Sequence, residues 1–262
     1  MIKCRLCFES LTESIFSAQL LRKNVAYFEC LNCGYVQTEE PYWLDNAYAS
    51  AINISDTGIM SRNLSNVSFV LATLILIKKK SVVVDYAGGH GFLVRLLRDV
   101  GVDAFWSDPY CENLVAKGFE YANHQQANLV TVFESFEHFV RPIDEIVKIL
   151  DIAPNILLTT NIISDPAPMP SEWWYYGLEH GQHVGFYRLR TLAYIANKFD
   201  LNLISDGVNR HFFSKHKYSY VVWRALIYLS SKFPKLLSLG MKSKTWSDHF
   251  FISSTKKNFY KK

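Results

Sequence analysis

An acidic residue and a glycine-rich turn lie between an apolar run and a helix-like segment in the first half of the chain. The apolar run covers residues 81–84, the turn reads Asp-Tyr-Ala-Gly-Gly-His-Gly over residues 85–91, and the helix-like segment begins at Phe92. Glycines permit tight turning and close backbone approach, and the first turn of a helix offers unpaired N–H groups. A buried strand that passes through such a turn into a helix is typical of a site for a nucleotide-like cofactor. The turn alone does not specify the cofactor, because glycine turns between strands and helices are common in α/β proteins.

A second acidic residue narrows the choice of cofactor. Asp108 follows the apolar segment 103–107 and stands 23 residues after Asp85. A carboxylate at the tip of a second strand can accept both ribose hydroxyls of a nucleoside, whether that nucleoside belongs to NAD or to S-adenosylmethionine. The order D-x-A-G-G-x-G differs from the G-x-G-x-x-G of pyrophosphate binders, and an acid before the glycines suits the cationic amino group of a methionine moiety. These two details favour S-adenosylmethionine.

Together these segments resemble the class I S-adenosylmethionine-dependent methyltransferases. The resemblance covers about residues 80–207 and includes the segment LVTVFESFEH at 129–138, which matches the fourth strand and its E-x-x-E-H ending. It implies that Asp85 and the glycine backbone hold the methionine part, that Asp108 holds the ribose, and that Glu134 faces the methionine end. It also implies adenine contacts from Pro109, Tyr110 and residues 122–126. The cofactor-binding residues expected in and around these motifs are Asp85, Ala87, Gly88, Gly89, Gly91, Asp108, Pro109 and Glu134.

One position inside the motif and one segment upstream of it also bear on cofactor binding. Ala87 stands where family members often carry glycine, and its methyl group is tolerable if the backbone stays at negative φ. Upstream, residues 45–63 correspond to a segment that folds over the cofactor in related methyltransferases. Arg62 in that segment could pair with the methionine carboxylate, since arginine supplies a bidentate geometry. An ordinary surface arginine is the alternative interpretation.

Four of the five cysteines form two C-x-x-C pairs near the start of the chain. The pairs are Cys4 with Cys7 and Cys30 with Cys33, separated by 22 residues, and Cys111 stands alone. Each pair can place two thiolates on one tight turn, and two such turns complete a tetrahedral site with four sulfur ligands. Two disulfides or a redox pair are the competing interpretations, but neither an oxidising compartment nor a thioredoxin-like context is indicated. The spacing predicts a structural zinc ribbon over residues 1–40 that folds only with its metal.

Histidines that could act as a general base lie in an aromatic segment with little periodicity, 162–187. Histidine titrates near neutrality, so His183 is the first candidate for the base, with His180, Glu179 and Tyr187 as neighbours. His138, at the end of the fourth strand, is the second candidate. Each histidine could instead be a packing element or a helix cap. A metal site built from His180, His183 and Glu179 is disfavoured, because the sequence H-G-Q-H gives no regular helical face.

The aromatic segment also carries the prediction of the substrate. Its pattern W-W-Y-Y…E-H-G-Q-H…F-Y resembles the region after the fifth strand in methyltransferases of bacterial sugar and polysaccharide pathways, some of which have an amino-terminal zinc-binding segment. The resemblance implies methyl transfer to a carbohydrate or carbohydrate-linked small molecule, with oxygen as the expected acceptor and carbon as the other option. RNA methylation is a second hypothesis, opposed by the scattered positive charge and the lack of an N-P-P-Y-like motif after the fourth strand. A non-catalytic interaction module is a third.

The expected elements place these residues on an α/β fold. Strands are predicted at 81–86, 103–107, 128–133, 155–161 and 201–206, with a last strand at 249–254. Helices are predicted at 61–79, 91–100, 110–117, 138–151 and 190–199, and in part of 41–53. Strands that alternate with helices indicate a Rossmann-like, mainly parallel sheet with helices on both faces. The domain prediction is a ribbon at 1–40 and a methyltransferase domain at 41–262, with a helical insertion at about 215–245.

Composition indicates an ordinary globular chain of 262 residues with a formal net charge of +4. No signal peptide is evident at the start, and the aliphatic run 69–77 is too short to span a bilayer, so a cytoplasmic location is expected. The charge excess gathers at the chain end, which favours a solvated tail over a nucleic-acid stripe. The apolar stretch 218–240 could lie on a membrane surface, or it could pack on the domain or on a second subunit of a homodimer.

Overall fold

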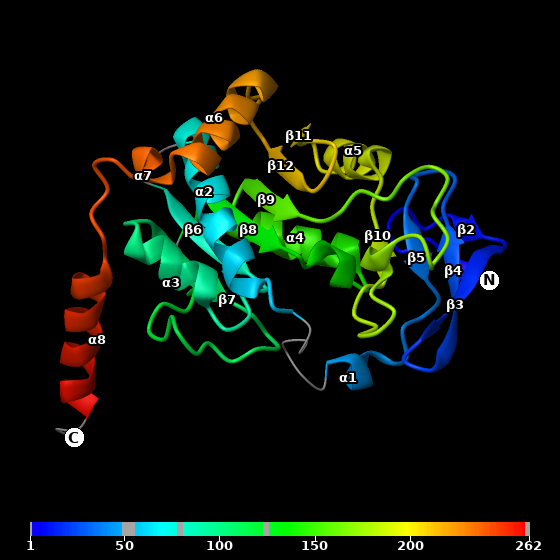
Figure 1. The fold of residues 1–262 in the computed structure, drawn as a ribbon, viewed down its shortest axis with the longest axis horizontal. Coiled ribbons are helices and arrows are strands. Elements are labelled where there is room, and N and C mark those ends of the chain that lie inside the picture. Colours follow the sequence, from blue (N-terminus) through cyan, green and yellow to red (C-terminus); the bar gives the residue numbers. More distant parts are fainter. Residues whose placement is uncertain (1, 49–55, 78–80, 123–125, 260–262) are drawn as a thin grey trace. The chain divides into compact units, whose positions relative to one another are not determined.

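The computed structural model describes residues 2–48, 56–77, 81–122 and 126–259 (Figure 1). The chain divides into two compact units. The first unit combines Met1–Asp56 with Val132–Lys217, and the second combines Thr57–Thr131 with Tyr218–Lys262. The residues of the predicted ribbon therefore belong to the same unit as the histidine-rich segment, while the glycine turn belongs to the other.

The central sheet has six strands in the order β11-β12-β9-β8-β6-β7. Strand β6 pairs in parallel with both β7 and β8, whereas β12 pairs antiparallel with β9 and with β11. This order confirms the predicted Rossmann-like α/β sheet. The strand bounds are β6 Val82–Tyr86, β7 Asp103–Ser107, β8 Leu129–Phe133, β9 Asn155–Thr159, β11 Asn202–Ser205 and β12 Arg210–Ser214.

The predicted last strand at 249–254 is wrong, because this segment lies inside helix α8, Thr245–Phe259. The last strand is β12, which forms a hairpin with β11 around Asp206 and Gly207. The Asp206 carboxylate accepts hydrogen bonds from the backbone N–H groups of Val208, Asn209 and Arg210, which closes the turn. Helix α8 is instead tied to its own unit by a buried ion pair: the guanidinium of Arg98 donates to both Asp248 oxygens at 2.7 Å.

Helices α2 (Ile59–Ile77), α3 (Phe92–Asp99), α6 (Tyr220–Lys232) and α7 (Pro234–Leu237) complete the described elements of the second unit. Helix α2 is long and apolar enough to cross a membrane by length and composition, but 39% of that window is buried. Its residues Val67 and 69–74 are buried, and Phe69 packs edge-on against Trp223 of α6 with ring centroids 5.8 Å apart. These contacts are those of a core helix.

The helix predicted at 110–117 does not form, since the backbone hydrogen bonds there are made elsewhere. The Asp108 carboxylate accepts from the N–H groups of Tyr110 and Cys111, and the carbonyl of His90 accepts from Leu114 and Val115. These bonds replace the i to i−4 pattern of a helix. The segment is therefore an irregular loop that is fastened to the glycine turn.

The first unit holds a four-stranded antiparallel sheet in the order β10-β5-β4-β3. Strands β3, β4 and β5 come from the start of the chain, and β10 comes from the aromatic segment. Buried aromatic rings, including Tyr27, Trp43 and Tyr176, form the core beneath this sheet. The remaining bounds are β1 Ile2–Lys3, β2 Ser10–Leu11, β3 Ser14–Leu20, β4 Lys23–Glu29, β5 Val36–Thr38, α1 Leu44–Ala47, η1 Phe136–His138, α4 Pro142–Ile152, η2 Trp174–Tyr176, β10 Gly185–Phe186 and α5 Leu189–Lys198.

Candidate functional site

The glycine turn in the second unit follows β6 and leads into α3. Gly88 has no room for a side chain, because a Cβ there would lie 2.9 Å from both an Asp85 carboxylate oxygen and the Trp106 ring. Gly89 differs: its φ is +53°, and a Cβ there would meet no atom within 4 Å. Gly91, the N-cap residue of α3, has φ +88°, and a Cβ there would lie 2.7 Å from the side-chain oxygen of Asn113. The turn is thus packed against the protein at Gly88 and open at Gly89.

The two predicted acidic residues lie on either side of this turn. Asp85 is buried and accepts a 2.7 Å hydrogen bond from the Thr131 hydroxyl. Burial raises the pKa of Asp85 to about 7, against the lowering effect of the Thr131 hydrogen bond. Asp108 accepts a 2.9 Å hydrogen bond from the Gly89 N–H, and the Trp106 indole donates to the Gly89 carbonyl at 2.7 Å. Among the described residues no cation pairs with the Asp85 carboxylate, which fits the ammonium of a methionine moiety, and Asp108 at the second strand tip fits a ribose.

The other predicted cofactor residues lie in varied surroundings. Ala87 has φ +57°, so the condition of a negative φ is not met, and the alanine takes a conformation that usually selects glycine. Pro109 is exposed beside Asp108, and Arg62 is exposed in the first turns of α2. Of the predicted adenine contacts at 122–126, residues 123–125 lie outside the described part of the chain. Glu134 belongs to the first unit, and its N–H donates to the Thr159 carbonyl and hydroxyl.

The four paired cysteines come together in the first unit. Their sulfur atoms all lie within 4.8 Å of one another, with Cys4 Sγ 3.6 Å from Cys33 Sγ and Cys7 Sγ 3.4 Å from Cys30 Sγ. Three of the four residues are buried, and all are unpaired thiols. Four sulfur ligands at tetrahedral spacing are the donor set that zinc prefers, so the cluster is consistent with a closed zinc site.

The candidate base His183 lies in a cluster of titratable side chains in the first unit. His183 Nδ1 donates a 2.6 Å hydrogen bond to the Tyr175 carbonyl, which leaves Nε2 with the free lone pair. The ring of His183 lies 4.9 Å from that of His138 and 4.8 Å from that of His180, centroid to centroid. The Tyr48 hydroxyl is 2.8 Å from His138 Nδ1. The structure therefore brings together the three histidines that the sequence singled out.

Burial decides the charge state of this cluster. It lowers the pKa of His183, lowers that of His138 well below its ordinary value, and lowers that of His180 to about 4. All three imidazoles are neutral at pH 7, as a proton acceptor must be. His180 Nδ1 accepts from the Gln182 N–H, so its proton is on Nε2.

Two members of the cluster were missed as site residues from the sequence. Glu137 is fully buried, and it accepts a 2.6 Å hydrogen bond from the Tyr175 hydroxyl. Burial raises the pKa of Glu137 to about 7, and its other oxygen has no hydrogen-bond partner among the described residues. The E-x-x-E-H motif contained Glu137, but nothing in the sequence shows that Tyr175 lies next to it. Together with His138 and His183, Glu137 could also hold a cation, because the ligand atoms of the three lie within 4.8 Å of one another.

Tyr187 and Glu179 are placed differently from the cluster. Tyr187 is fully buried, its hydroxyl donates to the Phe136 carbonyl at 3.0 Å, and its ring packs on Tyr35. These contacts are structural. Glu179 is exposed, and its charge opposes the lowering of the His180 pKa.

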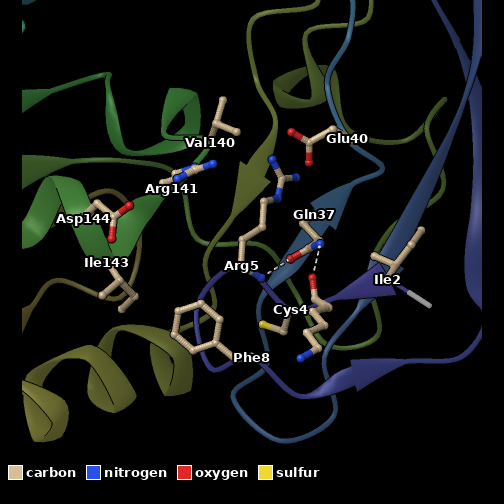
Figure 2. Close-up of a pocket in the computed structure, with 11 residues that line it drawn as sticks. Ile2, Cys4, Arg5, Phe8, Gln37, Glu40, Val140, Arg141, Ile143 and Asp144 are labelled. Carbon is tan, nitrogen blue, oxygen red and sulfur yellow. Dashed lines mark hydrogen bonds between the residues drawn. The ribbon is translucent and has the colours of Figure 1, made fainter.

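A separate pocket of about 450 Å³ lies beside the cysteine cluster in the first unit (Figure 2). Its wall carries both signs of charge, from Arg5 and Arg141 and from Glu40 and Asp144. Arg5 donates to the carbonyls of Thr38 and Val184, so this side chain links the cysteine turn to β5 and to the aromatic segment. Of the predicted site residues, Cys4 alone lines this pocket.

Strand, glycine turn and helix, with an acid at the tip of the neighbouring parallel strand, define an α/β protein that binds a nucleoside-containing cofactor. A family model described as a methyltransferase domain matches residues 59–206. The chain belongs to this family and is an S-adenosylmethionine-dependent methyltransferase.

Solved structures with a similar fold include magnesium protoporphyrin IX methyltransferase from Synechocystis and an O-methyltransferase family protein from Burkholderia thailandensis. The first is 14% identical, with a TM-score of 0.44, over 65% of this chain and 90% of that one. The second is 15% identical, with a TM-score of 0.43, over 67% of this chain and 68% of that one. Among curated proteins, no sequence matches this chain.

Proposed function

We propose that this methyltransferase acts on a carbohydrate or a carbohydrate-linked small molecule and that His183 removes the proton from the acceptor. The observation that carries the proposal is the hydrogen bond from His183 Nδ1 to the Tyr175 carbonyl, which leaves Nε2 as a proton acceptor. The aromatic segment around it supports a sugar-like substrate, since aromatic faces stack on sugar rings and Trp174 is largely exposed.

When bound, S-adenosylmethionine supplies an electrophilic methyl group. The residues of the chain orient the acceptor and take its proton. For a hydroxyl acceptor, the cofactor would supply the methyl group, and His183 Nε2 would take the hydroxyl proton. The Tyr175 hydroxyl donates to Glu137, and the Tyr175 carbonyl accepts from His183 Nδ1. These two bonds orient the His183 imidazole. The resulting imidazolium lies near a carboxyl group whose pKa of about 7 allows it to ionise.

We infer that the four cysteine thiolates hold one structural zinc ion. With four protein ligands the site is closed, so this metal would stabilise the fold and take no part in the reaction. The same unit carries the histidine cluster, so we expect loss of the metal to disturb the geometry of that cluster.

The decisive experiment incubates the purified chain with S-adenosylmethionine and a panel of nucleotide-linked and free sugars, and follows methylation by mass spectrometry. With an accepted substrate, His183→Ala is expected to lower kcat by about 10²- to 10⁴-fold, the usual contribution of a general base. His216→Ala, an exposed histidine in the same unit, serves as the matched control. A His183→Ala variant with full kcat and an unchanged pH profile contradicts the assignment of the base.

Two other results separate the parts of the proposal. If His138→Ala loses kcat while His183→Ala does not, the base is His138. If the chain binds S-adenosylmethionine but methylates no sugar in the panel and does methylate RNA, the substrate assignment is wrong although the family assignment stands.

A further inference from the structure

Charge is distributed unevenly between the last part of the chain and the rest. Residues 218–262 contain nine Lys and Arg residues but one acidic residue, Asp248, so they carry a net charge of +8. Residues 1–217 carry −4, which accounts for the overall +4. The single acid does not offset the basic side chains, because Asp248 is buried between Arg95 and Arg98.

The same segment exposes many apolar side chains. Helix α6 buries Trp223, Ile227 and Ser230 against its own unit and leaves most of its remaining surface open. Val221 is 73% exposed, Tyr228 is 64% exposed, and Leu239, just after α7, is 62% exposed. We call these residues, with the two basic side chains between them, the α6–α7 surface: Tyr220, Val221, Val222, Arg224, Tyr228, Leu229, Lys232, Phe233, Leu236 and Leu239.

A contiguous run of exposed apolar side chains on a soluble domain marks an interaction site. We propose that the α6–α7 surface binds the surface of an anionic lipid membrane. Branched aliphatic and aromatic side chains gain free energy from acyl chains, while Arg224 and Lys232 can extend toward anionic headgroups. An RNA partner would use the positive charge and the tyrosines but would gain little from Val221, Val222 and Leu239. The charge complementarity of an acid-poor segment favours an anionic membrane over a neutral one.

This inference is independent of the proposed sugar substrate, because binding to lipid can be measured without turnover. The full chain is mixed with vesicles of phosphatidylcholine alone or of phosphatidylcholine with phosphatidylglycerol, and bound protein is measured by co-sedimentation. Binding is expected only to the anionic vesicles and is expected to weaken as salt rises from roughly 0.1 to 0.5 M.

Two pairs of substitutions test the two components of the surface. Arg224→Gln with Lys232→Gln is expected to weaken binding about 30-fold, because each basic residue near the surface contributes about 1 kcal/mol, or about fivefold. Val221→Ser with Tyr228→Ser is expected to weaken binding by at least a similar factor through loss of apolar contact. The matched controls are Lys198→Gln on α5 and Val147→Ser on α4, which remove an exposed charge and an exposed apolar side chain elsewhere.

Three outcomes overturn the proposal. The first is equal binding to neutral and anionic vesicles, or none to either. The second is RNA binding that Arg224→Gln with Lys232→Gln weakens and that anionic vesicles do not compete with. The third is a dimer in solution that Val221→Ser with Tyr228→Ser converts to a monomer, because the surface would then cover a second copy of the chain. Circular dichroism of every variant establishes that a loss of binding is not a loss of fold.

Discussion

Gly89 offers the sharpest test of where the cofactor lies. A methyl group added at this position meets no atom of the described residues within 4 Å, so Gly89→Ala creates no clash with that part of the chain. If the open space beside Gly89 holds the cofactor, the new methyl group must collide with it. Gly89→Ala should therefore weaken cofactor binding without disturbing the packing of the protein.

The substitution also strains the backbone, and this effect must be measured separately. Gly89 has φ +53°, and a side chain in the left-handed region costs roughly 1–2 kcal/mol. Gly207, in the hairpin between β11 and β12, has φ +78° and likewise no atom within 4 Å of an added Cβ. Gly207→Ala is thus the matched control, and both variants should lose about the same free energy of unfolding.

Binding is where the two variants should differ. Forcing a methyl group into an occupied site costs roughly 1–3 kcal/mol, which corresponds to about 5- to 150-fold weaker binding of S-adenosylmethionine by Gly89→Ala. Gly207→Ala should bind as tightly as the parent chain. Isothermal titration calorimetry measures the dissociation constants, and urea unfolding measures stability. A Gly89→Ala variant with unchanged affinity refutes the placement of the cofactor beside this glycine.

Three more predictions concern charge and metal. Burial raises the folded pKa of Asp85 from 3.8 to about 7, so the ionised carboxylate destabilises the cofactor-free fold. The free energy of unfolding should therefore fall as pH rises from about 4 to about 7. In urea unfolding, Asp85→Asn should remove this fall. Asp248→Ala should lower the free energy of unfolding by about 3–5 kcal/mol, because it leaves the buried Arg98 guanidinium without its carboxylate. Asp99→Ala breaks a half-exposed ion pair and should lower it by less than about 1 kcal/mol. Equal losses would contradict this ranking. One zinc ion per chain is expected by elemental mass spectrometry, and Cys30→Ser should lose it while Cys111→Ser retains it; full zinc in Cys30→Ser would show that the metal lies elsewhere.

The sequence predicted the parallel part of the sheet well, because each strand there is an apolar run followed by a helix. The expected strand 103–107 coincides with β7, and the expected helix 61–79 overlaps α2. The failures lie where side chains redirect the backbone. Asn113 and Asp108 accept backbone hydrogen bonds that a helix at 110–117 would need. The hairpin strand β12 was missed although Asp206-Gly207 is a typical turn signal.

The sequence predicted most residues of the candidate site, but it did not predict which of them contact one another. The C-x-x-C spacing predicted the cysteine cluster, the glycine-rich motif and the resemblance predicted Asp85 and Asp108, and residue type predicted the histidines. The hydrogen bond between Glu137 and Tyr175 joins residues 38 positions apart, so no local sequence pattern predicts it. Left-handed backbone at Ala87 is likewise set by the turn as a whole and not by the alanine.

Strand β10 has a consequence for how the chain can be divided. Gly185 and Phe186 pair with Gln37 and Val36, so a piece of the histidine-bearing segment completes the sheet of the cysteine module. Between these two residues and His183, the Val184 carbonyl accepts from the Arg5 guanidinium and the Thr38 N–H, and the Val184 N–H donates to the backbone carbonyl of Glu137. Removing residues 1–40 would leave β10 without a partner strand and Val184 without its donors. The cysteine module is then no detachable accessory: a chain without residues 1–40 would lose the backbone contacts that hold the segment carrying His183, the proposed base.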